Sequence, residues 1–412
     1  MLINICKYLK LKDKTSLAAT CSQLKDTVYI KRLWKNTTVF IDLPAHTDDF
    51  KHIYTSFETR GINSLHFTVN DYSHFDAHIA LMATHWPGLF TITDETQLDP
   101  DGFPGETGVL QGKTLLNVRF LKLCSVNTNF VEMLQDLFPH LLELDISLTS
   151  FCDECAEVLV RSQSQINILR ASNTLITNRG VGYICGSFLS GQRDNDVPAQ
   201  PLSSLKLLDI SSCSLVTPNC FALLERLENL NTFYIGNRDL NSATDLGYLA
   251  RCGGLKCLIV ENNSMPEKVL SLISESGFRL HCLSLNSNIN DQSLIAFRNG
   301  FSNLLYLKLK SERITDKGMA TLAEHLNQLI GLDLTFCISI SYNSVLTIQN
   351  KLKNLKFLRI LGCHNITSSQ VASISSHICV HSDFGYSKED IGLDVLKSDE
   401  EDSIWFRRVF FD

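Results

Sequence analysis

The sequence predicts an α/β solenoid, in which short parallel strands and helices alternate in a stack of similar units. Three observations predict it. A phrase of three apolar residues, spaced by three and then two positions, recurs from about Val118 to His377. Its middle residues lie 23 to 26 residues apart, except at one step of 39. A turn and a helix-like segment follow each phrase, and one such unit is too short to bury its apolar side alone.

The phrase has the form L-x-x-L-x-L, which at a period of roughly 20–29 residues is typical of leucine-rich repeats. We therefore expect one parallel sheet on the concave side of the solenoid and helices on its convex side. The middle apolar residue of each phrase, called the anchor below, should be buried. The anchors are Leu121, Leu144, Leu169, Leu208, Phe233, Leu258, Leu283, Leu307, Leu332 and Leu358.

Composition and charge narrow the class of protein. A net charge of −7 and a pI near 6.0 argue against a dedicated nucleic-acid binder. No apolar run approaches the ~20 residues that span a bilayer, and the first 14 residues lack the apolar core of a signal peptide. Fourteen scattered cysteines indicate buried thiols in a reducing compartment. We expect a cytoplasmic or nuclear chain that binds neither nucleic acid nor membrane.

Residues 1–40 differ from the repeats. Apolar residues spaced as on one helical face occur twice, as Leu2, Ile5, Cys6 and Leu9, and then as Leu17, Cys21, Leu24 and Val28. Asp13 between the two groups predicts an N-cap, and Leu33-Trp34 follows them. A segment this short rarely buries so much apolar surface by itself, so we expect it to need a partner or the repeat stack.

This spacing ahead of leucine-rich repeats resembles an F-box, the short helical module that docks on the Skp adaptor of cullin-based ubiquitin ligases. The Leu-Pro-x-Glu of the family is missing, and Leu24 stands where an aromatic residue is frequent. The alternative is that residues 1–40 only cap the stack. The resemblance implies the adaptor-binding residues Leu2, Ile5, Leu9, Leu17, Leu24, Leu33 and Trp34.

The rest of the chain divides into three segments. Residues 41–116 are predicted to be a linker and degenerate first repeats, with strand patterns at 62–67 and 89–92 and a loop at 94–113, which is rich in glycine and proline. Residues 117–382 are predicted to form the solenoid, with a surface loop inserted around 190–201. Residues 383–412 leave the period and are predicted to be a C-terminal cap or tail.

The position five residues after the anchor predicts how each turn is built. It holds Cys213, Cys337 and Cys363 in three units, which resembles the cysteine-containing repeat subclass that is typical of F-box proteins with leucine-rich repeats. A small buried side chain is needed where the chain leaves the strand. In other units a polar residue can bond the turn backbone instead, and these are Thr149, Thr174, Asn263 and Asn288. Polar residues further along, such as Thr177 and Thr315, predict helix N-caps.

No motif for catalysis is complete. Residues 108–114 resemble a P-loop but have three residues, not four, between the glycines. The spacing of Cys152 and Cys155 suits a metal or a redox pair, but no second pair completes a zinc site. We therefore expect no catalytic residue, no metal site and no cofactor.

The residues that flank the buried anchors should point to the concave face. They include aromatic residues and arginines among polar neighbours, which is the composition of an interface. The predicted substrate-binding residues are Arg170, Asp209, Tyr234, Glu261, Tyr306, Lys308, Lys310, Asp333 and Arg359.

Together these features predict a non-enzymatic, substrate-recognition subunit of an SCF-type (Skp-cullin-F-box) ubiquitin ligase. The expected partners are a Skp-family adaptor, its cullin scaffold and a protein substrate, which would be ubiquitinated and degraded by the proteasome. The alternative is a leucine-rich-repeat scaffold or enzyme regulator with no link to a ligase.

Overall fold

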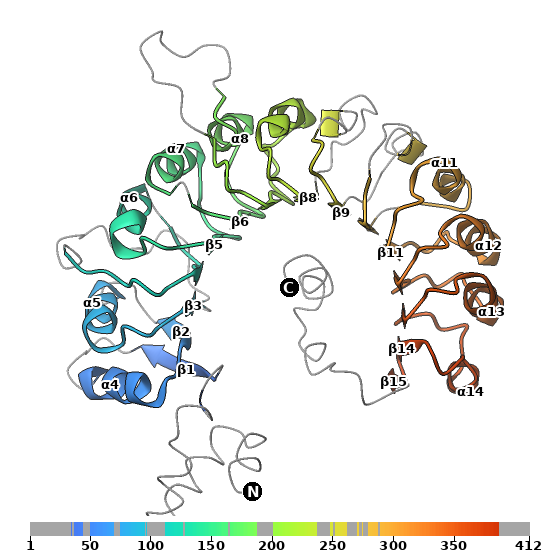
Figure 1. Cartoon of the computed structure of the whole chain (residues 1–412), viewed down its shortest axis with the longest axis horizontal. Helices are drawn as coiled ribbons and strands as arrows, with labels where there is room; N and C mark the ends of the chain where they lie inside the picture. The colour runs from blue at the N-terminus through green and yellow to red at the C-terminus, as the bar shows by residue number, and fades with distance from the viewer. Residues whose placement is uncertain are drawn as a thin grey trace, which may run out of the picture. The chain divides into compact units, whose positions relative to one another are not determined.

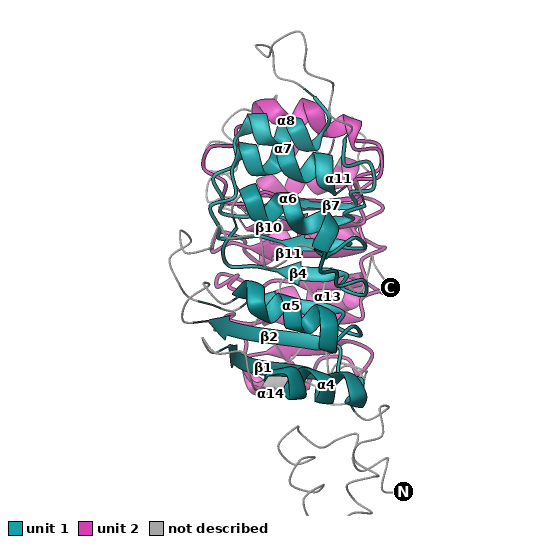
Figure 2. Cartoon of the chain, turned by 90° about the vertical axis from the view of Figure 1, so that its left-hand side faces the viewer, with its two compact units in different colours: residues 1–208 teal, residues 209–412 magenta. Residues whose placement is uncertain are grey.

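The computed structural model shows a leucine-rich-repeat fold of short strands and helices. It forms two compact units, unit 1 from Met1–Leu208 and unit 2 from Asp209–Asp412 (Figure 2). The structure describes residues 34, 37–43, 50–69, 75–94, 96, 112–126, 128–163, 165–187, 201–236, 248–249, 252–261, 270–271, 274, 279–286 and 289–386. Of the predicted loop at 190–201 and the predicted cap or tail at 383–412, the structure describes only residues 201 and 383–386.

Unit 1 alternates strands with helices, and the helices lie on one side of its sheet (Figure 1). Strands β1 to β6 pair in parallel and in chain order. The strands are β1 (Thr38–Leu43), β2 (Ser64–Val69), β3 (Thr91–Asp94), β4 (Phe120–Lys122), β5 (Glu143–Asp145), β6 (Ile168–Arg170) and β7 (Leu207–Asp209), which contains the unit boundary. The helices are α4 (Phe50–Arg60), α5 (Phe75–His85), α6 (Thr128–Leu137), α7 (Asp153–Ser162) and α8 (Asn178–Ile184).

Within the described residues, unit 2 also alternates strands with helical segments, two of which are 3₁₀ segments. Its strands β8 to β14 are parallel in chain order, and β15 is antiparallel to β14. The strands are β8 (Thr232–Ile235), β9 (Cys257–Glu261), β10 (Cys282–Asn286), β11 (Tyr306–Lys310), β12 (Gly331–Asp333), β13 (Phe357–Ile360), β14 (Cys379–Ser382) and β15 (Gly385–Tyr386). The helices are the 3₁₀ segments η5 (Pro218–Arg226) and η7 (Ser293–Ala296), then α11 (Phe297–Gly300), α12 (Asp316–His325), α13 (Tyr342–Lys351) and α14 (Ser368–Ala372).

The predicted anchors are register partners on neighbouring strands, which confirms the repeat frame. In unit 1 Leu121 pairs with Leu144, and Leu144 with Leu169. In unit 2 the paired series runs Phe233, Leu258, Leu283, Leu307, Leu332, Leu358. All ten anchors are at most 2% exposed, so they form the apolar layer between sheet and helices. Each leucine buried in this way stabilises its unit by about 2–5 kcal/mol relative to alanine.

The frame extends further toward the N-terminus than the clear repeats of the sequence. Val39 on β1, Leu65 on β2 and Ile92 on β3 continue the anchor register up to Leu121. The segment predicted as linker and degenerate repeats therefore contains β2 and β3 as strands of the same sheet, with α4 and α5 beside them. Alternation of apolar residues from Val39 to Leu43 is the signal that could have predicted β1.

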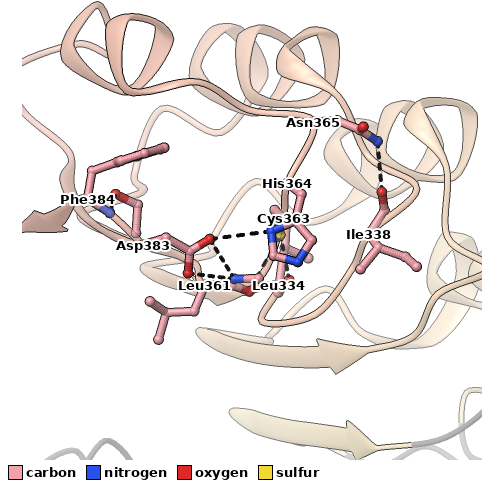
Figure 3. A network of polar contacts seen from close by, with 10 residues as sticks. Leu334, Ile338, Leu361, Cys363, His364, Asn365, Asp383 and Phe384 are labelled. Atoms are coloured by element: carbon pink, nitrogen blue, oxygen red, sulfur yellow. Dashed lines mark hydrogen bonds and ion pairs between the residues drawn. The ribbon is translucent and has the colours of Figure 1, made fainter.

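The turns after the strands are built as the sequence predicts. Cys213, Cys337 and Cys363 are buried, and the Cys363 thiol lies 3.2 Å from the carbonyl oxygen of Leu334 (Figure 3). The Thr149 hydroxyl instead donates to the carbonyl oxygen of Ile146 at 2.7 Å, and Thr174 makes the same bond to Ala171. Two of the predicted turn residues, Asn263 and Asn288, lie outside the described residues.

Several helices have a side-chain N-cap, and in three places an aspartate bonds the cap residue of the next repeat. Thr177, Thr315 and Ser341 are N-caps whose hydroxyls accept the amide hydrogen of the second residue beyond them. The carboxylate of Asp316, the first residue of α12, accepts hydrogen bonds from the amide and hydroxyl of Ser341 in the following repeat. Asp291 bonds Thr315 in the same way, and Asp153 bonds Thr177. Neighbouring helices are thus held in register by bonds as well as by apolar packing.

Candidate functional site

The candidate site is the face of the unit 2 sheet opposite the helices, called the open face below. Side chains alternate between the two faces of a strand, so the residues next to an anchor point away from the helices. Strand β11 shows this clearly, because Leu307 and Leu309 are buried whereas Tyr306, Lys308 and Lys310 are half-buried. The open face is therefore the surface on which the sequence predicts binding.

An apolar cluster occupies the open face between β8 and β11. Cys257 and Ile259 on β9 and Cys282 on β10 are almost completely buried, and Tyr234 and Tyr306 pack against them from either side. Burial, and then the neighbouring Cys282 thiol, raise the pKa of Tyr306 above its ordinary value. The tyrosine rings keep part of their surface accessible, so they form the outer layer of this tyrosine-flanked cluster.

Two lysines add positive charge beside the cluster. Lys308 and Lys310 lie on β11, one and three residues after the anchor. The Lys310 ammonium group lies 4.9 Å from the ring centroid of Phe336, which is a cation–π distance. Phe336 is 49% exposed, and its apolar ring continues the surface toward the turn after β12. Half-exposed aromatic rings beside cations are the groups that dominate many protein interfaces.

Asp333 and Arg359 bond each other on neighbouring strands. An Arg359 guanidinium nitrogen lies 3.6 Å from a carboxylate oxygen of Asp333, and both side chains are buried. The other carboxylate oxygen of Asp333 accepts hydrogen bonds from the amide and hydroxyl of Thr335. The geometry gives both residues a role in holding β12, β13 and the next turn together, and their predicted contact with a substrate stays a prediction.

Asp209 has the same local structure as Asp333. Its carboxylate accepts hydrogen bonds from the amide and the hydroxyl of Ser211, at 3.0 and 2.7 Å. Asp145 accepts the amide of the second residue after it in the same manner, as does Asp94, which lies two residues after Ile92. These bonds are Asx turns, which fix the chain as it leaves the strand. Aspartate directly after an anchor is thus first a turn residue.

Of the predicted substrate-binding residues, Arg170 has a described side chain and Glu261 does not. Arg170 ends β6 in unit 1, is half-buried, and has one guanidinium nitrogen that is buried without a hydrogen-bond acceptor among the described residues. Its register partner on β5 is Asp145. Glu261 ends β9 in unit 2, and its side chain is outside the description. The structure brings Tyr234, Tyr306, Lys308 and Lys310 to one surface of unit 2.

Six of the seven predicted adaptor-binding residues lie outside the described residues, namely Leu2, Ile5, Leu9, Leu17, Leu24 and Leu33. The seventh, Trp34, is 2% exposed. The Arg60 guanidinium of α4 lies 5.7 Å from its ring centroid, and the Trp34 carbonyl oxygen accepts the Thr37 amide at 3.0 Å. Trp34 is therefore packed where the chain enters the first strand.

The sequence interpretation missed Cys257, Ile259 and Cys282 as members of the open face. A signal was present, because the run from Cys257 to Val260 is apolar without alternation. Such a run indicates a strand that is buried on both faces. The apolar layer under Tyr234 and Tyr306 could therefore have been predicted from β9.

The described residues include no group of three or more histidine, cysteine, aspartate or glutamate side chains arranged to hold a metal ion. Among the helices that the structure describes, none has the length and apolar character needed to cross a membrane. Cys152 and Cys155 do lie together, with their sulfur atoms 3.7 Å apart.

Comparison with known proteins shows similarity to solved structures but not to known sequences. No protein-family model and no curated protein sequence matches the chain. Among solved structures, the crystal structure of the Rad7 and Elc1 complex from yeast includes a chain that is similar over 92% of both chains, with 13% sequence identity and a TM-score of 0.49. At this identity and TM-score, nothing about the function of the chain follows from the match.

Proposed function

We propose that the chain is the substrate-recognition subunit of an SCF-type ubiquitin ligase. Its repeats bind a protein substrate through the open face of unit 2, and its first 40 residues bind a Skp-family adaptor and, through it, a cullin. The chain itself breaks no bond. Holding the substrate beside the conjugating machinery raises the effective concentration of substrate lysines, and proximity of this kind can replace a large part of a bimolecular barrier.

The observation that carries the binding role is the tyrosine-flanked cluster with Lys308 and Lys310 beside it. Parallel strands fix the relative positions of these side chains, because each strand is hydrogen-bonded to both neighbours in register. A surface that is ordered before binding loses little conformational entropy when a partner docks. Tyrosine and lysine on such a surface suit a partner with apolar and acidic groups.

The link to a ligase comes from the sequence of residues 1–40. Two groups of apolar residues at helical spacing, followed by Leu33-Trp34, resemble the F-box pattern. The burial of Trp34 beside Arg60 supports an attachment of this segment to the first repeat. A module that is fixed to the repeats would hold the adaptor at a constant distance from the bound substrate.

Affinity purification of the full chain with the proteasome blocked tests both roles at once. The unchanged chain should retain an adaptor, a cullin and a substrate. Leu9→Asp should release adaptor and cullin and keep the substrate, because it places a charge on the apolar face of the first predicted helix. Lys310→Glu and Tyr306→Ala should keep the adaptor and release the substrate.

A matched control reverses the same charge on the other side of the sheet. Lys317 is exposed on α12, seven residues after Lys310, and Lys317→Glu should retain all partners. If the unchanged chain retains no adaptor and no cullin, the ligase role is wrong and the scaffold alternative takes its place. If Lys310→Glu and Lys317→Glu release the substrate equally, the open face is not the binding surface.

A further inference from the structure

Cys152 and Cys155 stand at the start of α7 and have no part in the proposed function. Cys152 is the N-cap of this helix, with an extended backbone, and its side chain makes no capping bond. Cys155 lies one turn into the helix and is buried. The Cys152 thiol points at the Cys155 sulfur, 3.7 Å away. Two thiols in contact, one reachable and one enclosed, are the components of a dithiol–disulfide pair.

The geometry fits a disulfide with a small movement. Residues three apart at a helix N-terminus have Cα atoms about 5 Å apart, which lies within the range of disulfides. The two sulfur atoms must approach from 3.7 Å to the S–S bond length of roughly 2 Å. A change of side-chain rotamer at the N-cap supplies part of this approach, because the side chain of Cys152 makes no cap bond, and a shift of the first turn of α7 supplies the rest.

The surroundings give the two thiols different roles. Burial raises the pKa of the Cys155 thiol to about 12, so this thiol stays protonated and inert until a partner is next to it. Cys152 is half-buried, so a small disulfide can reach its sulfur. The Cys152 side chain is hydrogen-bonded to the Glu154 carboxylate, which also interacts with the Arg179 guanidinium of α8. Cys152 is therefore the thiol that reacts first.

We propose that Cys152 and Cys155 form a reversible disulfide by exchange with a low-molecular-weight disulfide such as glutathione disulfide. The Cys152 thiolate attacks one sulfur of the small disulfide, forms a mixed disulfide and releases one glutathione thiolate. Cys155 then loses its proton to solvent and attacks the Cys152 sulfur, which releases the second glutathione. Two protein thiols are oxidised and one small disulfide is reduced to two thiols. Only a small fraction of Cys155 is thiolate, which slows this second step. Because the two sulfur atoms are already in contact, the step still proceeds.

A disulfide between Cys152 and Cys155 would affect the hydrogen bonds between the start of α7 and the start of α8. Asp153 lies between the two cysteines, and its carboxylate accepts the Thr177 amide at 2.8 Å, the Thr177 hydroxyl at 2.7 Å and the Gly180 amide at 2.9 Å. The fit is close, because a Cβ on Gly180 would lie 2.5 Å from an Asp153 oxygen. Drawing the two sulfurs together moves the first turn of α7, and these three bonds weaken.

A second cysteine pair provides an internal control. Cys257 and Cys282 are register partners on β9 and β10, and both are completely buried. Burial, and then a hydrogen bond with the Cys257 thiol, raise the pKa of Cys282 well above its ordinary value. Proximity alone would oxidise both pairs, whereas access together with proximity would oxidise only Cys152 and Cys155.

The test treats the full chain under native conditions with a series of glutathione disulfide and glutathione ratios. The exchange is then stopped with acid, the chain is unfolded, its free thiols are alkylated, and each cysteine is read by peptide mass spectrometry. The Cys152–Cys155 peptide should lose two hydrogens, reversibly, while Cys257 and Cys282 are alkylated in full. In Cys155→Ser a glutathione adduct should accumulate on Cys152, about ten times faster than on any buried cysteine. In Cys152→Ser, Cys155 should stay unmodified.

Amide hydrogen exchange measures whether oxidation weakens the bonds between Asp153 and the start of α8. In the unchanged chain, oxidation should speed exchange in peptides that cover residues 174–184, and Cys152→Ser should remove this effect. The proposal is overturned if Cys152 in Cys155→Ser reacts no faster than Cys257 or Cys282. It is also overturned if the mixed disulfide forms but the unchanged chain never proceeds to the internal disulfide.

Discussion

The two units close their turns with different side chains at the same position, five residues after the anchor. In unit 1 the hydroxyls of Thr149 and Thr174 donate to a carbonyl oxygen of their own repeat, three residues earlier. In unit 2 the Cys337 thiol donates to the carbonyl oxygen of Leu309, which is 28 residues earlier and belongs to the preceding repeat. Cys363 does the same toward Leu334. These threonines therefore make a hydrogen bond within their own repeat, whereas these cysteines make one to the preceding repeat.

The comparison explains why cysteine is frequent here without being reactive. Burial raises the pKa of Cys337 and of Cys363 to about 12, so neither thiol ionises near neutral pH. Cys337 and Cys363 suit the turn because their side chains are small and make a weak hydrogen bond within an apolar layer. Cys152 lies outside this position and is half-buried, so a small oxidant can reach it whereas it cannot reach Cys337 or Cys363.

The aspartate bridge is common to both units, and its removal should have the largest effect. Asp153→Ala in unit 1 and Asp316→Ala in unit 2 each leave amide and hydroxyl groups of the next helix cap without their acceptor. Bonds to a charged acceptor contribute roughly 1.5–3 kcal/mol, so each change should lower the free energy of unfolding by about 2–3 kcal/mol. Urea unfolding measures the loss. Asp136→Ala, at an exposed position of α6, is the control and should change stability little.

The pH dependence separates the bridge from simple packing. Although partial burial acts to raise it, hydrogen bonds from Ser341 and Ser344 lower the pKa of Asp316 below its ordinary value. A carboxylate with a depressed folded-state pKa stabilises the fold above its unfolded pKa, and the stabilisation is lost as the pH falls through the folded pKa. The difference in stability between the unchanged chain and Asp316→Ala should therefore shrink below about pH 4. A constant difference across this range would contradict the bridge.

The sequence predicts the parts of the fold that depend on period, and it misses those that depend on neighbouring strands. The anchors from Leu121 to Leu358 follow from spacing alone, and the structure pairs them in register. The burial of Cys257 and Cys282 on the open face depends on tyrosines of β8 and β11, and only the unbroken apolar run of β9 gives a local sign of it. Asp333 has the charge of a binding residue, but the ion pair with Arg359 forms only when β12 and β13 pair.

Exchange of the turn residues should have an intermediate effect. Cys337→Thr keeps a small side chain that can bond within its own repeat, as Thr149 does, and should cost at most about 1 kcal/mol. Cys337→Leu adds volume to a close-packed layer and should cost roughly 1–3 kcal/mol. Thr149→Val removes the bond to Ile146 and should cost about 1–2 kcal/mol. Urea unfolding ranks the three changes. A cost of Cys337→Thr equal to that of Cys337→Leu would show that the two units do not share one turn design.

The smallest predicted effect concerns the residue just before this position. Four residues after the anchor the backbone is left-handed in five repeats, with φ between 52° and 67°. The residues there are Leu148, Asn173, Ser212, Phe336 and Gly362. A left-handed conformation costs most residues roughly 1–2 kcal/mol, and asparagine tolerates it better. Large apolar side chains at this position are therefore unfavourable for the backbone, and only contacts can offset the cost.

Leu148 makes few side-chain contacts and Phe336 makes several, so substitutions at the two positions compare the two units. Leu148 is 70% exposed, so Leu148→Asn should raise the free energy of unfolding by about 1 kcal/mol in urea unfolding. The Phe336 ring lies under the Lys310 ammonium group and against Gly362, so Phe336→Asn gains backbone freedom but loses both contacts. Its net change should be near zero or destabilising. If both variants gained stability equally, the ring of Phe336 would contribute nothing to the fold, and its exposed surface would have to be explained by binding alone.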